Sequence, residues 1–221
     1  MRTMQLWRAY LNDWWALSPA KTRAIGALAA MLVLAQIGQP FPEIAWLHHV
    51  PTFLLLAAAP PLLRRWPMSD GAVIAIALFF ALHTLGGRWT YSNLPYDEWS
   101  KALTGTSLGE LFGWRRNHYD RLVHFAFGLL GYGAVREVAL RHLGQGRRLA
   151  TATAFGFVVA VGALYEIFEW LLTFTVAPEV AEDYNGQQGD MWDAQKDMAL
   201  ALAGALVAAT WARWRRGWPT R

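Results

Sequence analysis

The sequence predicts an all-α, polytopic membrane protein, a helical bundle with about six transmembrane helices. Of its 221 residues, 55% are hydrophobic and only 16% are charged, whereas a soluble domain usually carries about 25% charged residues. The chain also contains 13 tryptophans and no cysteine. The lack of cysteine excludes a disulfide framework, a thiolate metal site and a cysteine nucleophile. This composition favours a bundle in a lipid bilayer over a soluble enzyme.

Six stretches are apolar and long enough to cross the hydrocarbon layer, which takes roughly 20 helical residues. The expected spans are 22–39, 47–63, 70–88, 118–140, 149–177 and 191–214. The second stretch is short and contains Pro51, Pro60 and Pro61. Because proline disrupts helical hydrogen bonding, we expect this span to be kinked or partly re-entrant.

The segments outside these spans also carry structural signals. Residues 1–21 combine tryptophans with polar residues and favour an interfacial helix. Residues 89–117 form the longest connection, and connections of this length are often functional. We expect it to face outward and to contain short helices at 95–103 and 108–114. The whole chain, 1–221, is expected to form a single membrane domain.

The distribution of lysine and arginine predicts the orientation. Basic residues gather in both termini and in the second and fourth connections, whereas residues 39–46 and 178–189 contain none. Because basic loops stay in the cytoplasm, both termini are expected there, and the odd-numbered connections face outward. The net charge of +4 then reflects topology and contact with anionic membrane lipids, and no nucleic-acid partner is expected.

Ionisable side chains inside the spans gather near their outward ends. Each costs about 2.5 to 3.5 kcal/mol on insertion scales, so such groups face the bundle interior or water. Helical spacing places the ionisable residues of each span on one face of it: Asp120 with His124, Glu166 with Glu169, and Asp190 with Asp193 and Asp197. At 1.5 Å per residue, Glu169 lies about 13 Å and Glu166 about 18 Å inside the outer end of the fifth span.

Small residues follow these groups on the same helix faces, where they let helices approach closely. They are Gly128, Gly131, Gly162, Ala201 and Gly204. The sequence therefore predicts a polar cavity that opens outward and is closed below by tight packing.

The grouped acids predict a divalent metal site. Several carboxylates at short range cannot all stay ionised without a cation, and carboxylates and imidazoles on facing helices build metal sites in bundles. Oxygen-rich ligands suit Mg²⁺ or Mn²⁺, and histidine ligation makes Zn²⁺ suitable as well. The expected metal ligands are Glu166, Asp193, Asp197 and His124.

The same region supplies residues for catalysis and for substrate binding. The expected catalytic residues are His124, Glu169 and Asp120, and the expected substrate-binding residues are Arg121, His83 and Tyr91. No glycine-rich phosphate loop, G-x-S-x-G or H-E-x-x-H motif is present. A metal-assisted hydrolase or transferase acting on an envelope lipid or lipid-linked group is therefore the favoured class.

Three other interpretations stay open. A proton- or cation-coupled carrier would exchange protons at Glu166 and Glu169, but six spans would have to form a homodimer to make a two-fold carrier, and no internal repeat is visible. A non-catalytic membrane module would stabilise a partner, and the cluster would then only hold its own helices together. Structural roles are the third: Asp190 as a helix N-cap, Asp197 in a salt bridge and His124 in packing.

From His83 onward the chain resembles the YjdF-type family of small bacterial inner-membrane proteins. The matching stretches are HTLGGRWTYSNLP at 83–95, NHYDRLVHFAFG at 117–128, YEIFEW at 165–170 and QGDMWDAQKDM at 188–198. The resemblance implies a multi-pass protein of the inner membrane and marks no activity. The positions it singles out are His83, Tyr91, Pro95, His118, Tyr119, Asp120, Arg121, His124, Glu166, Glu169, Gly189, Asp190, Asp193 and Asp197.

A more distant pattern links the chain to envelope chemistry. The order of D-R-x-x-H on one span, an acid on the next and a late aspartate is similar to that of VanZ-like membrane proteins. Those proteins are associated with resistance to glycopeptide antibiotics, so the similarity implies a role in the cell envelope and names no reaction.

Overall fold

The computed structural model describes residues 2–175, 181 and 184–215, and over these residues every regular element is a helix. The long helices are α2 (Pro19–Gln36), α3 (Ala45–Arg65), α4 (Asp70–Arg88), α7 (Tyr119–Arg141), α8 (Arg147–Leu172) and α10 (Asp193–Arg215). The shorter ones are α1 (Arg2–Trp15), α5 (Tyr96–Thr104) and α6 (Leu108–Phe112). The predicted all-α class is confirmed, and each long helix overlaps one of the expected spans.

The long helices differ in whether each is, by itself, long and apolar enough to cross a membrane. Among the described residues, α3, α4 and α8 are long and apolar enough to cross one. The pair α1 and α2, bent by 119°, passes the same test if it is counted as one broken span. Helices α7 and α10, which carry the grouped ionisable residues, do not pass it. The number of crossings and the side on which the termini lie therefore stay predictions.

Two expected spans can be compared with the structure in part. Helix α3 is continuous, although Pro51, Pro60 and Pro61 lie inside it. Helices in membranes tolerate proline because neighbouring groups take up the freed hydrogen bonds, and two of these prolines fall near the helix end. Helix α8 ends at Leu172, with a turn at 173–175. The expected end at residue 177 lies outside the described residues.

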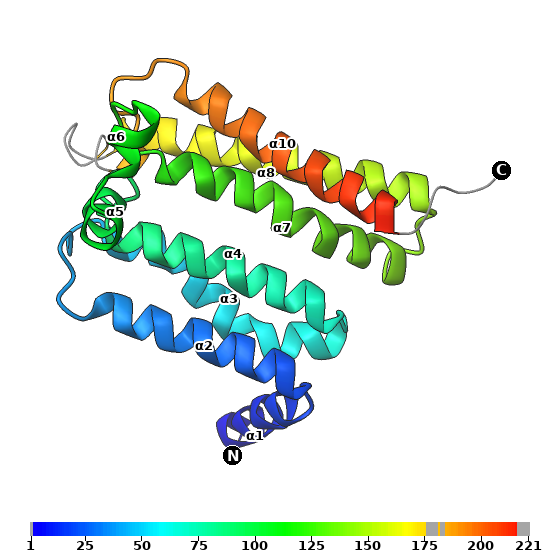
Figure 1. Ribbon diagram of the computed structural model, residues 1–221. Coiled ribbons are helices and arrows are strands. Elements are labelled where there is room, and N and C mark those ends of the chain that lie inside the picture. Colours follow the sequence, from blue (N-terminus) through cyan, green and yellow to red (C-terminus); the bar gives the residue numbers. More distant parts are fainter. Residues whose placement is uncertain (1, 176–180, 182–183, 216–221) are drawn as a thin grey trace.

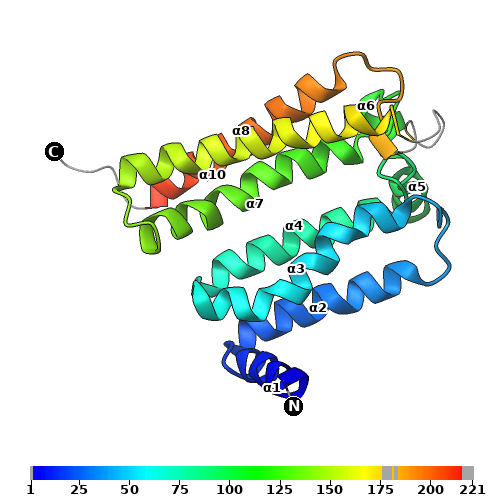
Figure 2. The same cartoon turned by 180° about the vertical axis from the view of Figure 1, so that it is seen from behind.

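The long helices form two groups that lie against each other. Helices α2, α3 and α4 make one group, and α7, α8 and α10 make the other (Figure 1). The view from behind shows α3 beside α4, and α8 beside α7 (Figure 2). Helix α4 packs on α7 and so joins the two groups. Many outward side chains are exposed and apolar, among them Leu78, Leu164, Leu206 and Val207, as expected for a surface that meets lipid.

Helices α7 and α10 pack with their backbones in close approach. A Cβ atom at Gly128 would overlap the carbonyl oxygen of Ala201, and one at Gly204 would overlap the carbonyl oxygen of Phe125. Small residues permit this approach, as the sequence predicted. The expectation for Gly131 is wrong, because its nearest neighbour is the Phe127 ring of its own helix, 3.9 Å from a built Cβ.

Two N-cap serines, Ser18 and Ser69, help to connect the two helix groups at the starts of α2 and α4. Ser18 caps α2 and donates a hydrogen bond to Asp70 at 2.7 Å. Ser69 caps α4, and both its amide and its hydroxyl lie 2.5 Å from carboxylate oxygens of Glu137 on α7. The starts of α2 and α4 are thereby fixed to α7.

We predict that Gly128→Ala destabilises the protein and that Gly133→Ala does not. Both glycines lie in α7, but a Cβ at Gly133 would meet nothing within 4 Å. Alanine favours a helix over glycine by about 1 kcal/mol, whereas overpacking costs about 1 to 3 kcal/mol. Thermal unfolding in detergent should show a lower midpoint for Gly128→Ala and an unchanged or higher one for Gly133→Ala. Equal midpoints would contradict the close α7–α10 contact.

Candidate functional site

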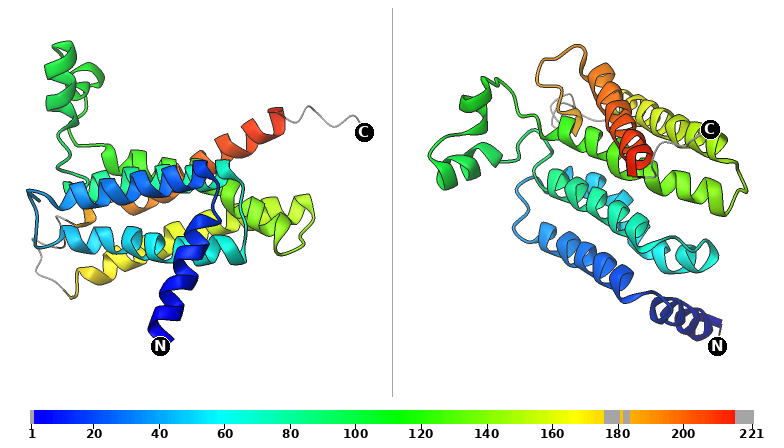
Figure 3. Two further views of the ribbon diagram at one scale, coloured as in Figure 1. Left: turned by 90° about the horizontal axis from the view of Figure 1, so that it is seen from below. Right: turned by 45° about the vertical axis from the view of Figure 1, so that its right-hand side comes forward.

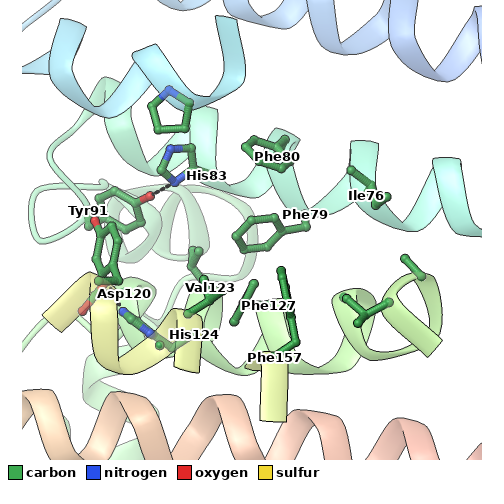
Figure 4. A pocket seen from close by; sticks show the side chains of 17 residues that line it. Ile76, Phe79, Phe80, His83, Tyr91, Asp120, Val123, His124, Phe127 and Phe157 are labelled. Carbon is green, nitrogen blue, oxygen red and sulfur yellow. Dashed lines mark hydrogen bonds and ion pairs between the residues drawn. The ribbon is translucent and has the colours of Figure 1, made fainter. Parts of the chain in front are cut away.

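A cavity of about 410 Å³ lies between the two helix groups. Most of its wall is apolar and comes from α4, α7 and α8, including Ile76, Phe79, Phe80, Phe127, Val135 and Phe157. Its polar lining residues are His83, Tyr91, Asp120, His124 and Tyr165. Figure 4 shows His83, Tyr91, Asp120 and His124 gathered at one end, while the phenylalanines line the rest. The cavity is thus apolar along its length and polar at one end.

Three ionisable side chains meet at this polar end. Asp120 and His124, one turn apart on α7, face Asp197 on α10, and one ligand atom from each lies within 4.8 Å of the others. The distance from His124 Nε2 to Asp120 Oδ1 is 3.6 Å. All three residues are buried, with Asp197 only 2% exposed. The tight α7–α10 packing therefore brings two carboxylates and an imidazole together.

Glu166 joins this group from α8, whereas Glu169 lies further along the same helix. The distance from Glu166 Oε1 to His124 Nε2 is 3.8 Å. Glu169 is half-buried, and its backbone carbonyl accepts a hydrogen bond of 3.2 Å from the amide of Asn185. Glu169 is not among the residues that line the cavity.

Two buried carboxylate oxygens at this site are unsatisfied. Within the described part of the chain, Asp197 Oδ1 and Glu166 Oε1 have no hydrogen-bond partner. Buried polar atoms are nearly always paired, and a buried charge needs a counter-charge. Such a group is suited to a cation, either a metal ion or protons on the carboxyls themselves.

The other two aspartates of the same pattern, at the start of α10, are fully engaged. Arg116 contacts both carboxylate oxygens of Asp193, at 2.6 and 3.4 Å, and Arg121 reaches Asp193 at 3.2 Å. Asp190 pairs with Arg121, and with Lys196 at 2.6 Å. Asp193, which we expected to bind metal, therefore lies in a separate cluster of ion pairs and not with Asp197.

Asp190 also contributes to the start of α10. Its carboxylate accepts a hydrogen bond of 3.1 Å from the backbone amide of Trp192, as an N-terminal capping group does. Arg121 is held between this carboxylate and that of Asp193, and its Nε atom has no partner in the described residues.

His83 and Tyr91 form a hydrogen-bonded pair on the cavity wall. His83 Nε2 lies 2.7 Å from the carbonyl oxygen of His48. Because a carbonyl only accepts, this nitrogen carries the hydrogen, and Nδ1 is free to accept from the Tyr91 hydroxyl. Tyr91 and the preceding Thr90 both have positive φ, 57° and 47°, which is strained for side chains of this kind. The backbone strain places the Tyr91 ring against His83.

Sequence reasoning missed several residues of this region. His48 and His49, which were not among the expected site residues, are 0% and 5% exposed. His49 lies 2.9 Å from Gln36 and 3.2 Å from the Thr84 carbonyl. Polar residues such as Gln36 and Thr84 inside apolar stretches were the signal that could have revealed this buried network. Arg116 and Tyr165 were also missed, and only the fold brings them to the site.

Comparison with known proteins now identifies the family. A family model described as "Predicted membrane protein (DUF2238)" matches residues 20–217. The chain belongs to this family. It is 32% identical over 184 residues to the inner membrane protein YjdF of Escherichia coli (strain K12), which covers 82% of this chain and 84% of that protein. No solved structure matches. The predicted resemblance to YjdF-type proteins is confirmed.

Family membership and the apolar helices establish the class of the protein. It is an integral membrane protein, and its location is the bacterial inner membrane, as the sequence predicted. Neither description names a reaction, a substrate or a partner. Function must therefore be argued from the cavity and its side chains.

Asp190→Asn should reveal a pH-dependent contribution to stability. The hydrogen bond from Lys196, the Trp192 amide and Arg121 lower the pKa of Asp190 from its usual value of 3.8. Because the folded pKa lies below the unfolded one, the carboxylate stabilises the fold above about pH 4 and loses this effect as the pH falls.

We therefore expect a lower midpoint of thermal unfolding for Asp190→Asn at pH 7, and a difference from the parent protein that shrinks toward pH 3. The exposed acid Glu98 offers a control, and Glu98→Gln should follow the parent at every pH. A difference for Asp190→Asn that is constant with pH would contradict the charge-based role.

Proposed function

We propose that the protein binds an envelope lipid or lipid-linked molecule and catalyses metal-assisted hydrolysis or group transfer at its headgroup. The hydrocarbon chain would occupy the apolar cavity, and the headgroup would lie at Asp120, His124 and Asp197. The observation that carries this proposal is a buried Asp197 oxygen that has no hydrogen-bond partner among the described residues. It belongs to the same group as Asp120 and His124, which line the polar end of an otherwise apolar cavity.

The donor set supports a catalytic metal site. Two carboxylates and one imidazole suit Mg²⁺, Mn²⁺ or Zn²⁺, and three protein ligands leave positions for water and substrate. A bound metal would polarise a headgroup oxygen and activate water. Glu166, 3.8 Å from His124, would complete the ligand set or accept a proton from that water. We propose that Glu169 supports this group without contacting the metal or the substrate itself.

The shape of the cavity supports a lipid substrate. Phe157 lines the cavity and is also 45% exposed, so the apolar wall continues to the lipid-facing surface of the bundle. A hydrocarbon chain could therefore enter sideways from the bilayer without passing through water. His83 and Tyr91 lie across the polar end from Asp120. Both nitrogens of His83 are engaged, but the Tyr91 hydroxyl, which donates to His83, can still accept a hydrogen bond from the headgroup.

The ion-pair cluster at the start of α10 supports an anionic headgroup. It contains three cations, Arg116, Arg121 and Lys196, against the two acids Asp190 and Asp193. The sum of +3 and −2 leaves one positive charge, and Arg121 Nε retains an unused hydrogen. Arginine in this arrangement suits phosphate or carboxylate recognition.

The metal site is tested by measuring the metal content of detergent-purified protein by elemental mass spectrometry. We expect a near-stoichiometric divalent metal in the parent protein and its loss in Asp197→Asn. Asp193→Asn, the same change one turn earlier on α10, is the matched control and should retain the metal, because arginines engage that carboxylate.

Absence of metal from both the parent and Asp193→Asn, even after incubation with Mg²⁺, Mn²⁺ and Zn²⁺, would reject the metal-dependent mechanism. The unsatisfied oxygens would then favour protonated carboxyls, and with them the proton-exchanging carrier. Proton flux across the membrane of reconstituted liposomes, compared between the parent and Glu166→Gln, would test that second candidate.

The lipid site is tested by filling the cavity. Gly131 lines it, and a Cβ there would meet only the Phe127 ring, at 3.9 Å. Gly131→Leu should therefore fold normally and lose most of the lipid that co-purifies with the parent, as measured by extraction and mass spectrometry. Gly133→Leu, on the exposed side of α7, should retain it. Equal lipid content in both variants would contradict a lipid in the cavity.

A further inference from the structure

The short helices α5 and α6 form a hairpin that stands apart from the bundle. It connects the end of α4 to the start of α7 and extends sideways, across the direction of the long helices and level with their ends (Figure 3). Neither short helix contains a buried residue. If the long helices cross the membrane, the hairpin runs along the membrane surface.

The hairpin is held together by its own polar contacts. The Gly109 amide donates to the Asp97 carboxylate at 2.9 Å, and Lys101 pairs with Glu110 at 3.3 Å. Ser107 and Glu110 form a reciprocal capping box at the start of α6. These contacts join α5 to α6 along one side, so the hairpin does not need the bundle for its shape.

Large apolar side chains point away from these contacts. Trp99 and Leu103 each lie two residues beyond Asp97 and Lys101, which places them on the opposite side of α5. Leu103 is 86% exposed, and the other apolar residues of the hairpin region, 39% to 65% exposed, are Trp99, Leu111, Phe112 and Trp114. A folded, rigid segment with this much exposed apolar surface is unusual in contact with water.

Three observations favour lipid as the covering partner. The apolar surface continues the lipid-facing surface of the bundle, because the Trp99 ring packs edge-on against Trp89 at the end of α4, with centroids 5.6 Å apart. Tryptophan is the residue that membrane interfaces favour. The hairpin also lies level with the ends of the long helices, where the headgroups would be.

We propose that the α5–α6 hairpin lies in the outward surface of the bilayer, with Trp99, Leu103, Leu111 and Phe112 inserted among the lipid headgroups and upper acyl chains. Residues 96–115, which contain the hairpin, carry two basic residues, Lys101 and Arg115. They also carry three acidic ones, Asp97, Glu98 and Glu110, so the net charge of this segment is −1. Insertion is therefore driven by apolar burial and needs no anionic lipid. This inference is independent of the proposed reaction and of the metal.

The absence of cysteine from the chain makes a direct test simple. Leu103→Cys and Leu111→Cys would each be spin-labelled in the full-length protein and reconstituted into phosphatidylcholine vesicles. Collision rates with oxygen, which concentrates in the bilayer, and with a water-soluble nickel chelate report the depth of each label. Glu98→Cys, about 140° from Leu103 around α5, is the matched control.

We expect the labels at residues 103 and 111 to show a severalfold higher ratio of oxygen to nickel collisions than the label at 98. The ratio should be unchanged when part of the phosphatidylcholine is replaced by phosphatidylglycerol. Three results would overturn the proposal: free access of the nickel reagent to all three labels, shielding of the apolar-side labels from both reagents, or a high ratio in anionic vesicles alone. The second would indicate a contact with another copy of the chain.

Discussion

The close packing of α7 on α10 is the contact on which the rest of the site depends. Gly128 and Gly204 allow the two backbones to meet, and this approach brings Asp120 and His124 within reach of Asp197. Neither helix is strongly apolar, and each carries ionisable groups that the other compensates in part. Larger residues at the two glycines would separate the carboxylates and remove the reason for a cation between them.

The three aspartates at the start of α10 show how position along one helix face sets the role of a residue type. Asp190, the most exposed of the three, pairs with Arg121 and Lys196 and caps the helix start. Asp193 pairs with two arginines. Asp197 is the most buried and keeps an oxygen without a partner among the described residues. Charge compensation thus decreases as burial increases, so that the most buried carboxylate is the one available to a ligand.

The long helices and the shared faces of the site could be predicted from the sequence, because both depend on local patterns. Apolar length located the long helices, and the spacing of Asp120, His124 and Asp197 located the shared faces. Spacing on one helix cannot determine which neighbour a face meets. Asp193 was therefore assigned to the metal, although Arg116, in the loop before α7, reaches it first.

The buried histidines of α3 were missed for a similar reason. His48 and His49 follow a tryptophan near the end of an apolar stretch, a pattern typical of an interface. Their burial depends on Gln36 from α2 and Thr84 from α4. A polar residue inside an apolar stretch indicates that it needs a partner, but not which helix supplies that partner. Likewise, Pro51, Pro60 and Pro61 favoured a kinked or partly re-entrant span, whereas one continuous helix runs through all three.

The weak hydropathy of α7 and α10 has a consequence for biogenesis. Neither helix passes alone as a membrane span, yet α8, which separates them along the chain, does. Arg121 on α7 meets its acidic partners Asp190 and Asp193 only when the start of α10 has been synthesised. Stable integration of α7 therefore waits for the start of α10, and a chain cut short before residue 190 would leave Arg121 without these carboxylates.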